Sequence, residues 1–312
     1  MTQGDPAGIG PEVALKAACD DAVQASCELV LVGDSTVWRA ASDEFGIPLP
    51  FPVEDVGQLP AGEFFRGQID AECGRAAFGA LMRAIELVQN GTVDGIVTAP
   101  LSKASLHLAG ISEPGHTEIL AKATRSRSWA LMLHSKKISC VFATCHVALK
   151  SVPEILTVER VVEVASLMRN ALLAIHGGRE PRLALLGFNP HAGEGGLFGD
   201  EEIRMLGPAA ARARAMGIDL SDPIPPDTAF TCDALARFDG HVCLYHDQGG
   251  IPFKMLAFDE GVNLTLGLPW VRTSPDHGTA FDIAWKGCAR PNSMKSAILL
   301  ATRLCRVGGG GG

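Results

Sequence analysis

Short apolar runs alternate along the chain with longer stretches of helical periodicity, and this alternation restricts the fold more than any other feature. The runs at 27–33 and 93–100 end in Gly or Pro, and residues 71–91 between them place apolar side chains at helical spacing. The same alternation continues through 137–149, 157–175, 181–196, 201–217 and 239–250. Strands that alternate with helices require crossover connections, so the sequence predicts an α/β fold with a largely parallel sheet.

Composition narrows the class of function. Of the 312 residues, 47% are hydrophobic and 20% charged, and the formal net charge is −8. This balance disfavours nucleic acid or an anionic membrane as the main partner, because both select clustered Lys and Arg. The nine cysteines lack CxxC spacing, no signal peptide is evident, and no apolar run is long enough to cross a membrane. We therefore expect a cytoplasmic protein with a small-molecule ligand.

Three histidines each follow an apolar run at the point where a strand is expected to end: His146, His191 and His246. The carboxyl ends of parallel strands form the ligand-binding edge of an open α/β sheet. Three imidazoles from distant segments suit a catalytic divalent metal with open positions for substrate oxygen. The alternative is that each histidine is a hydrogen-bonded loop residue or a lone proton donor.

The segment CLYHDQGGIPFK, residues 243–254, is expected to be a strand followed by a loop. Asp247 lies beside His246 and could orient it, while Gly249, Gly250 and Pro252 would shape the backbone before Lys254.

Two other segments indicate anion binding less specifically. PGHTE at 114–118 is typical of a helix start with Thr117 as the cap, and a helix N-terminus beside His116 could also hold a phosphate or carboxylate. The glycine-rich stretch at 3–18 resembles a phosphate cradle but lacks both GxGxxG and the P-loop lysine.

Downstream, glycines at 187–196 suggest close backbone approach to another group or a long surface loop. Lys254, Asn263 and Arg272, placed in strand-like segments, could converge on an anion, although surface salt bridges are the common use of such residues.

Several of these motifs occur together in a known family. The segments GDPAGIGPE, TAPLSK, PGHTE, NPHAGEGGLFGDEE, PPDTAF, YHDQGGIPFK and GVNLTLGLPWVRTSPDHGTAFDIA resemble, nearly end to end, the 4-hydroxythreonine-4-phosphate dehydrogenase family of vitamin B6 (pyridoxine) biosynthesis. DHGTAFDIAWKG also resembles the adenosine-binding loop of isocitrate and isopropylmalate dehydrogenases.

This resemblance implies two α/β domains, isocitrate/isopropylmalate dehydrogenase-like, with the active site in a cleft between them and residues drawn from both subunits of a homodimer. Residues 1–118 with 265–305 would form the NAD side, and 119–264 the metal and dimer side. Residues 306–312 would be a flexible glycine tail.

The resemblance also assigns roles to residues. The metal ligands would be His146, His191 and His246, for zinc, magnesium, manganese or cobalt. The substrate contacts would be His116, Thr117, Lys254, Asn263 and Arg272, and NAD or NADP would lie on His277, Gly278, Ala280 and Asp282. The acid–base candidates are Asp247, Asp227 and His116.

The implied reaction is the NAD- and metal-dependent oxidation of 4-phosphooxy-L-threonine, with decarboxylation to 3-amino-2-oxopropyl phosphate. One alternative is the paralogous branch that oxidises erythronate- or threonate-4-phosphate. A branch that acts on dihydrodiols of aromatic acids, and a non-catalytic phosphosugar-acid binding protein, are further alternatives.

Two positions depart from the family pattern. The strand before GDPAG is expected to be short, because only Met1, Thr2 and Gln3 precede Gly4. Trp285 stands where many relatives carry Gly, a form more reminiscent of the sugar-acid branch.

Overall fold

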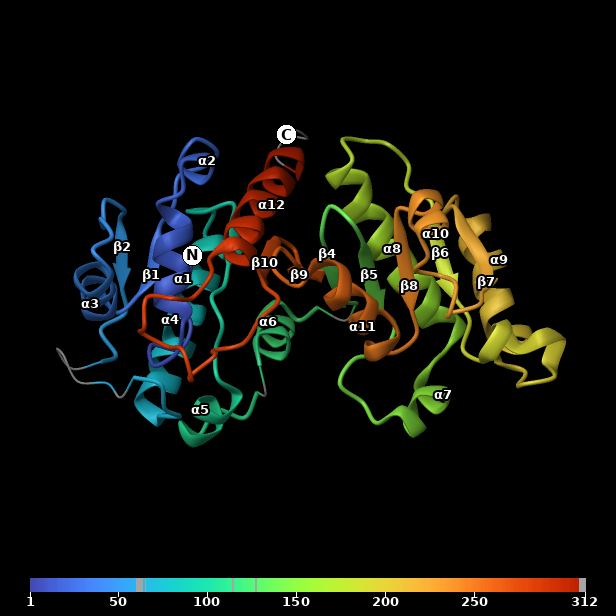
Figure 1. Cartoon of the computed structure of the whole chain (residues 1–312), viewed down its shortest axis with the longest axis horizontal. Coiled ribbons are helices and arrows are strands. Elements are labelled where there is room, and N and C mark those ends of the chain that lie inside the picture. The colour runs from blue at the N-terminus through green and yellow to red at the C-terminus, as the bar shows by residue number, and fades with distance from the viewer. Residues whose placement is uncertain (60–63, 65, 114, 127, 309–312) are drawn as a thin grey trace. The chain divides into compact units, whose positions relative to one another are not determined.

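A computed structural model describes residues 1–59, 64, 66–113, 115–126 and 128–308 (Figure 1). The chain divides into two compact units. Unit 1 comprises Met1–Arg127 with Leu268–Gly312, and unit 2 comprises Ser128–Gly267. The boundaries inferred from the sequence, after 118 and after 264, lie slightly before both of these breaks.

Unit 1 alternates strands with helices, as the sequence predicts. Its elements are α1 (Gly10–Ala18), α2 (Asp21–Gln24), β1 (Leu31–Gly33), α3 (Ser35–Phe45), β2 (Val53–Asp55), α4 (Ala71–Gln89), β3 (Gly95–Val97), α5 (Lys103–Leu108), α6 (His116–Thr124), β10 (Val271–Pro275) and α12 (Asn292–Gly308).

The pairing in unit 1 is parallel. β1 pairs with β2, and β10 pairs with β3. Thr2 forms parallel bridges to Val32 of β1 and to Thr98 just beyond β3, so the first residues of the chain occupy the position between these strands. The expected short first strand is therefore reduced to a bridge at Thr2. α4 packs its apolar face on this core, which includes Leu81, Ile85 and Ile96.

Unit 2 is also α/β. Its elements are β4 (Ala130–His134), β5 (Ser139–Phe142), η1 (Leu149–Ser151), α7 (Val152–Ile155), α8 (Val158–Ile175), β6 (Leu183–Leu186), η2 (Pro190–Gly196), η3 (Glu202–Leu206), α9 (Gly207–Ala215), β7 (Leu220–Ile224), α10 (Cys232–Arg237), β8 (Gly240–Cys243), α11 (His246–Ala257) and β9 (Val262–Leu266).

The strands of unit 2 lie in the order β9-β4-β5-β8-β6-β7. β5, β8, β6 and β7 are parallel neighbours, whereas β4 runs antiparallel to both β5 and β9. A Cβ at Gly240 would meet Met168 of α8, and a Cβ at Gly249 of α11 would meet Cys243. Because side chains alternate along β8, α8 and α11 cover opposite faces of the sheet. The predicted α/β class with largely parallel sheets is confirmed.

Three local expectations are wrong. Residues 246–257 form helix α11 rather than a loop, with Pro252 inside it. Lys254 is therefore helical rather than part of a strand-like segment. At the C-terminus, α12 continues through Arg306 to Gly308, so these residues are helix and not tail. Residues 309–312, the rest of the expected tail, lie outside the described residues. Among the described helices, none is long and apolar enough to span a membrane.

Candidate functional site

The three predicted metal ligands follow three adjacent parallel strands. His146 follows β5, His246 follows β8 and His191 follows β6, and these strands are neighbours in that order. All three histidines thus belong to the carboxyl edge of the unit 2 sheet, as the sequence predicts. That edge is the binding edge of open α/β sheets.

The structure brings two of these imidazoles together. The ring centroids of His146 and His246 are 5.6 Å apart. Two imidazoles bound to one ion at about 2.0–2.1 Å place their centroids about 5 Å apart in tetrahedral geometry. The pair lines an open cavity of about 300 Å³, with Thr144, Val147, Leu149, Val152, Tyr245 and Asp247. The spacing and the nitrogen donors fit a divalent transition metal.

His191 does not complete a three-ligand group within the chain. Across the residues that the structure describes, no three His, Cys, Asp or Glu side chains are gathered in a way that could hold a metal ion. His191 is exposed and its ring lies 6.1 Å from that of Phe198. Its role as a ligand stays a prediction.

Backbone hydrogen bonds and polar side chains fix the carboxyl ends of these strands. Thr144 Oγ1 donates to the carbonyl of Leu244 at 2.8 Å, which ties the residues after β5 to those after β8. Gln248 is buried; its Nε2 donates to Gly187 O at 2.8 Å and its Oε1 accepts from Leu244 N at 2.7 Å. The amide in HDQGG therefore links the ends of β8 and β6, a role the sequence analysis missed.

The acidic neighbour of His246 is in contact with it. The Nδ1 atom of His246 lies 2.7 Å from Asp247 Oδ1. A carboxylate on one ring nitrogen fixes the ring orientation and leaves the other nitrogen to face a ligand. The ring of His246 also stacks on Phe142, with centroids 5.4 Å apart.

Gly249, in the first turns of α11, lies very close to the sheet. A Cβ at this position would lie 2.5 Å from Cys243 Sγ and 3.1 Å from Cys140 Cβ. The first turns of α11 therefore pack directly on the sheet, and this close approach holds His246 at the sheet edge. Gly249 therefore serves helix–sheet packing and not the loop expected from the sequence, whereas a Cβ on Gly250 would lie 3.3 Å from the ring of His246.

A buried cation lies in unit 1. Arg272 of β10 is 3% exposed and its Nη2 donates to Thr98 Oγ1 at 2.7 Å. Burial lowers the pKa of Arg272 to about 9. Burial, and then the charge of Arg272, hold the pKa of His116 well below its usual value, so His116 is neutral at pH 7. A buried guanidinium and a neutral imidazole together can bind an anion and donate or accept one proton.

Residue 116 begins α6, and Gly115, not Thr117, is its N-cap. The expected Thr117 cap is wrong because His116 is already helical. Pro114 lies outside the described residues.

The expected adenosine loop follows β10. His277 Nε2 is buried and has no hydrogen-bond partner among the described residues, and burial lowers the pKa of His277. Ala280 has a left-handed backbone, with φ of 41°. An unpaired buried nitrogen is typical of a site that awaits a polar ligand, so the segment fits a nucleotide cofactor. Gly278 is exposed and open, and the carbonyl of Asp282 accepts from Lys286 Nζ at 2.6 Å.

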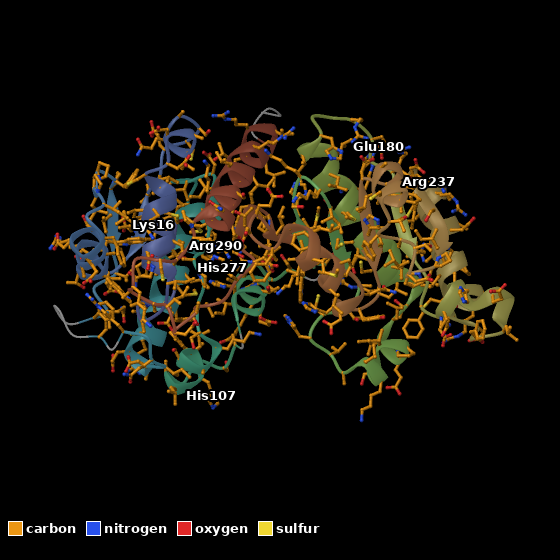
Figure 2. The ribbon with its side chains drawn as sticks, in the orientation of Figure 1. Lys16, His107, Glu180, Arg237, His277 and Arg290 are labelled. Atoms are coloured by element: carbon orange, nitrogen blue, oxygen red, sulfur yellow. The ribbon has the colours of Figure 1, made fainter. Side chains whose placement is uncertain are left out.

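The glycine-rich stretch near the N-terminus supports this loop. Ile9 N donates to Thr279 O at 2.9 Å, and a Cβ on Gly8 would lie 2.9 Å from Thr279. Lys16 lies on α1 (Figure 2), and its Nζ donates to Gly287 O at 2.8 Å. Packing against the loop accounts for Gly8, so a phosphate cradle is not needed to explain it.

The remaining predicted residues are placed separately. Lys254 is exposed on α11, and Asn263 lies on β9 with a buried Oδ1 that has no hydrogen-bond partner among the described residues. Asp227 is exposed in the turn after β7. Two buried acids were not among the residues predicted from the sequence: Asp5, whose pKa burial raises to about 6, and Glu202, which lies beside the His191 loop. An acid next to several glycines is the signal that could have indicated both.

The family described as "Pyridoxal phosphate biosynthetic protein PdxA" matches residues 24–301. The chain belongs to this family. A D-threonate 4-phosphate dehydrogenase of Salmonella typhimurium is 42% identical, covering 97% of this chain and 98% of its own. A 4-hydroxythreonine-4-phosphate dehydrogenase of Geobacter metallireducens is 40% identical, covering 100% and 96%. The crystal structure of a 4-hydroxythreonine-4-phosphate dehydrogenase from Klebsiella pneumoniae is also similar, with a TM-score of 0.87 and 40% identity, covering 97% of this chain and 96% of its own.

Proposed function

We propose that this chain is an NAD-dependent, metal-dependent dehydrogenase that oxidises 4-phosphooxy-L-threonine and decarboxylates it to 3-amino-2-oxopropyl phosphate. The observation that carries the proposal is the His146–His246 pair, which lines a cavity at the carboxyl edge of the unit 2 sheet. Membership of the PdxA family, whose relatives are named dehydrogenases, supports the reaction class.

His146, His191 and His246 would hold the divalent metal. When bound, the cation supplies a Lewis acid that lowers the pKa of a substrate hydroxyl and stabilises the enolate of decarboxylation. Asp247 would keep the His246 ring in its ligating orientation through the 2.7 Å contact at Nδ1. Three nitrogen donors favour zinc or cobalt over magnesium, with manganese between them.

A second copy of the chain would supply the third imidazole. The described residues pair His146 with His246 but do not gather His191 with them. Exposed apolar side chains support a homodimer: Ile251, Met255 and Phe258 are 58%, 81% and 65% exposed at the helix that carries His246. An apolar stripe of this kind on a helix marks a surface for another protein.

Unit 1 would bind the cofactor and the acidic groups of the substrate. His277, Gly278, Ala280 and Asp282 would hold the adenosine half of NAD or NADP, and the nicotinamide accepts the hydride. Arg272 would bind a phosphate or carboxylate as a buried planar donor.

Other predicted residues would complete the substrate contacts. Thr117 would contact the substrate from α6, and Lys254 and Asn263 from unit 2. Neutral His116 suits a proton-transfer role at pH 7 because its pKa is lowered. Asp227 and Asp247 are weaker acid–base candidates, since both are exposed.

The test is NADH formation, followed at 340 nm, with purified chain, NAD and a divalent metal. Parallel reactions contain 4-phosphooxy-L-threonine, D-threonate 4-phosphate or D-erythronate 4-phosphate. Turnover mainly on the amino acid supports the proposal. Turnover mainly on a sugar acid supports the second candidate, which the 42% identity to a D-threonate 4-phosphate dehydrogenase favours. Absence of turnover on all three by folded, metal-loaded protein contradicts both.

Mixing two inactive variants tests the shared metal site. If His191 comes from the other subunit, a heterodimer of His191→Ala and His246→Ala chains contains one site with all three imidazoles. Activity should then appear on mixing and subunit exchange. If all three ligands come from one chain, every site lacks one imidazole and the mixture stays inactive.

We also propose a cytoplasmic location. The nine cysteines, all within the described residues, are free thiols. Unpaired thiols in this number are typical of a reducing compartment.

A further inference from the structure

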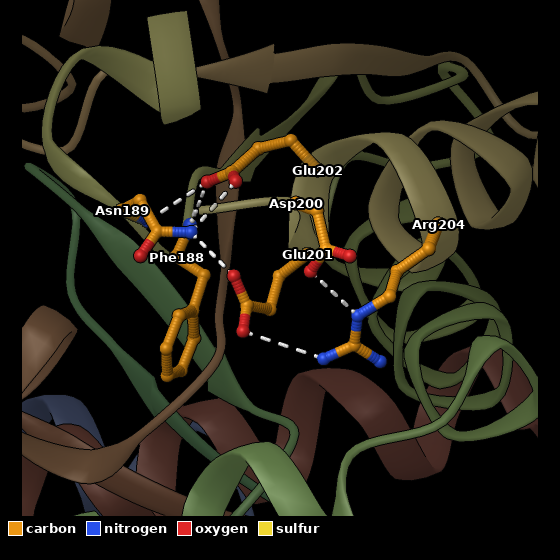
Figure 3. A network of polar contacts seen from close by, with 6 residues as sticks. All are labelled: Phe188, Asn189, Asp200, Glu201, Glu202 and Arg204. Atoms are coloured by element: carbon orange, nitrogen blue, oxygen red, sulfur yellow. Dashed lines mark hydrogen bonds and ion pairs between the residues drawn. The ribbon is translucent and has the colours of Figure 1, made fainter. Parts of the chain in front are cut away.

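Glu202 fastens the backbone that leads to His191. It is the first residue of η3, a π-helical turn that continues into α9, and it is 8% exposed. Its Oε1 accepts hydrogen bonds from the backbone N–H groups of Phe188 at 2.7 Å and Asn189 at 2.8 Å (Figure 3). Its Oε2 accepts from Asn189 Nδ2 at 2.9 Å, and that amide also donates to Glu201 at 2.7 Å. The residues between β6 and His191 are thus held by a buried carboxylate.

The turn that carries His191 also packs against this carboxylate. A Cβ added to Gly193 would lie 2.7 Å from Glu202 Oε2, and one added to Gly187 would lie 3.3 Å from Oε1. The backbone on both sides of His191 therefore passes close to Glu202, and at Gly193 it leaves no room for a side chain.

This turn needs such support because it is strained. Residues 191–195 all have positive φ, and His191, Ala192 and Glu194 are not glycines, with φ of 52°, 53° and 45°. A left-handed conformation is disfavoured for a non-glycine residue, because its Cβ lies too close to the backbone carbonyl oxygen. Such strain persists where surrounding contacts over-determine the backbone, and it gathers at functional sites, as π-helical turns do. Hydrogen bonds to a charged carboxylate are about twice as strong as neutral ones, so Glu202 can offset this strain.

We propose that Glu202 is a positioning residue that holds His191 in the orientation in which it binds the metal, an inference that rests on the proposed ligand role of His191. Glu202 acts through the backbone of residues 188–193 and does not bind the metal itself. Asn189 contributes to this positioning, because its side-chain amide donates hydrogen bonds to both Glu202 and Glu201.

The experiment compares Glu202→Gln with Glu194→Gln. Both remove one negative charge near the turn, but Glu194 is exposed. In the Glu202→Gln variant, one acceptor oxygen becomes an NH₂ group, which in either orientation of the amide faces a donor: the backbone N–H groups of Phe188 and Asn189, or the side-chain amide of Asn189. We expect the Kd for cobalt(II), measured on metal-free protein by competition with a chelating dye, to rise about 10- to 100-fold in Glu202→Gln. The Kd of Glu194→Gln should stay at the wild-type value.

A second readout does not depend on metal. Amide hydrogen exchange of residues 188–199 in the metal-free protein should accelerate in Glu202→Gln and not in Glu194→Gln. If Glu202→Gln does not fold, Asn189→Ala replaces it, because this variant keeps both backbone hydrogen bonds to Glu202. A smaller rise in Kd is then expected, and an unchanged Kd overturns the inference.

His191→Ala separates the ligand role of His191 from the positioning role of Glu202. If His191→Ala binds cobalt(II) as the wild type does, the proposed ligand role is wrong and the positioning role with it. If His191→Ala binds weakly but Glu202→Gln binds normally, only the positioning role is overturned. If Glu202 acts through His191, the double variant should bind no more weakly than His191→Ala alone.

Discussion

The indole Nε1 of Trp285 donates a hydrogen bond to the carbonyl oxygen of Pro6 at 2.8 Å, although the two residues are 279 positions apart in the sequence. Trp285 is buried although its backbone is left-handed, with φ of 61°. Its ring stacks on Phe45 with centroids 5.6 Å apart, and the guanidinium carbon of Arg66 lies 4.2 Å from its centroid. Trp285 thus fastens the expected adenosine loop to the start of the chain.

Trp285→Gly should destabilise the protein despite relieving backbone strain. Glycine at a left-handed position recovers about 1–2 kcal/mol, whereas loss of a buried Trp costs about 3–5 kcal/mol. We expect the free energy of unfolding, from urea titration, to fall by roughly 1–4 kcal/mol. Trp285→Phe keeps the ring contacts, loses the bond to Pro6, and should lose only about 1 kcal/mol. A Trp285→Gly variant as stable as wild type would show that the contacts of the indole contribute no more than the roughly 1–2 kcal/mol of backbone strain that glycine relieves.

Arg272→Met should stabilise the free protein while weakening substrate binding. Burial disfavours the charged guanidinium, as its lowered pKa indicates, so a neutral side chain of similar length should raise the free energy of unfolding by roughly 1–4 kcal/mol. If Arg272 binds a substrate anion, kcat/KM should fall at least about 30-fold, equivalent to about 2 kcal/mol. Lower stability with unchanged kcat/KM would instead assign Arg272 a structural role.

Gly249→Ala should push α11 away from the sheet. Its new methyl group would lie 2.5 Å from Cys243 Sγ, and overpacking of this kind destabilises by about 1–3 kcal/mol. Metal affinity should fall as well, because α11 begins at His246. Adding Cys243→Ala removes the nearest clashing atom and should restore part of both losses. An unaltered thermal midpoint and metal affinity in Gly249→Ala would disprove the close packing.

The stability of unit 2 should fall as the solution becomes acidic. His241 is buried on β8, its Nε2 lies 2.9 Å from Ala229 O, and burial lowers its pKa from 6.5. Below pH 6.5 the unfolded chain takes up a proton at this residue and the folded protein does not. The free energy of unfolding should therefore decrease by up to about 1.4 kcal/mol per pH unit between pH 6.5 and the lower folded-state pKa. Urea titrations at pH 7.5, 6.5 and 5.5 measure this slope.

His241→Gln is the matched variant for the pH measurement. Its amide nitrogen reaches about as far as the Nε2 atom of His241, so it can still donate to Ala229 O, but it does not titrate. The difference in slope between the two proteins isolates His241 from other groups, and equal slopes would show that His241 titrates normally in the folded state.

The sequence by itself determined the fold class and the edge of the sheet that carries the candidate site. Strand and helix periods are local properties, so the runs at 137–149 and 157–175 predicted β5 and α8 correctly. The rule that parallel strands share a carboxyl edge then placed His146, His191 and His246 there without coordinates.

The tertiary structure decided what local periodicity cannot encode. Residues 246–257 have the composition of a loop, but packing of Gly249 on the sheet outweighs the weak helix propensity of Gly and Pro. The order of strands in a sheet depends on contacts between distant parts of the chain. In this sheet the order brings His146 close to His246, whereas His191 lies on a strained turn. The contacts of Gln248, Glu202 and Trp285 join residues far apart in sequence, so only the folded chain brings their partners within hydrogen-bonding distance.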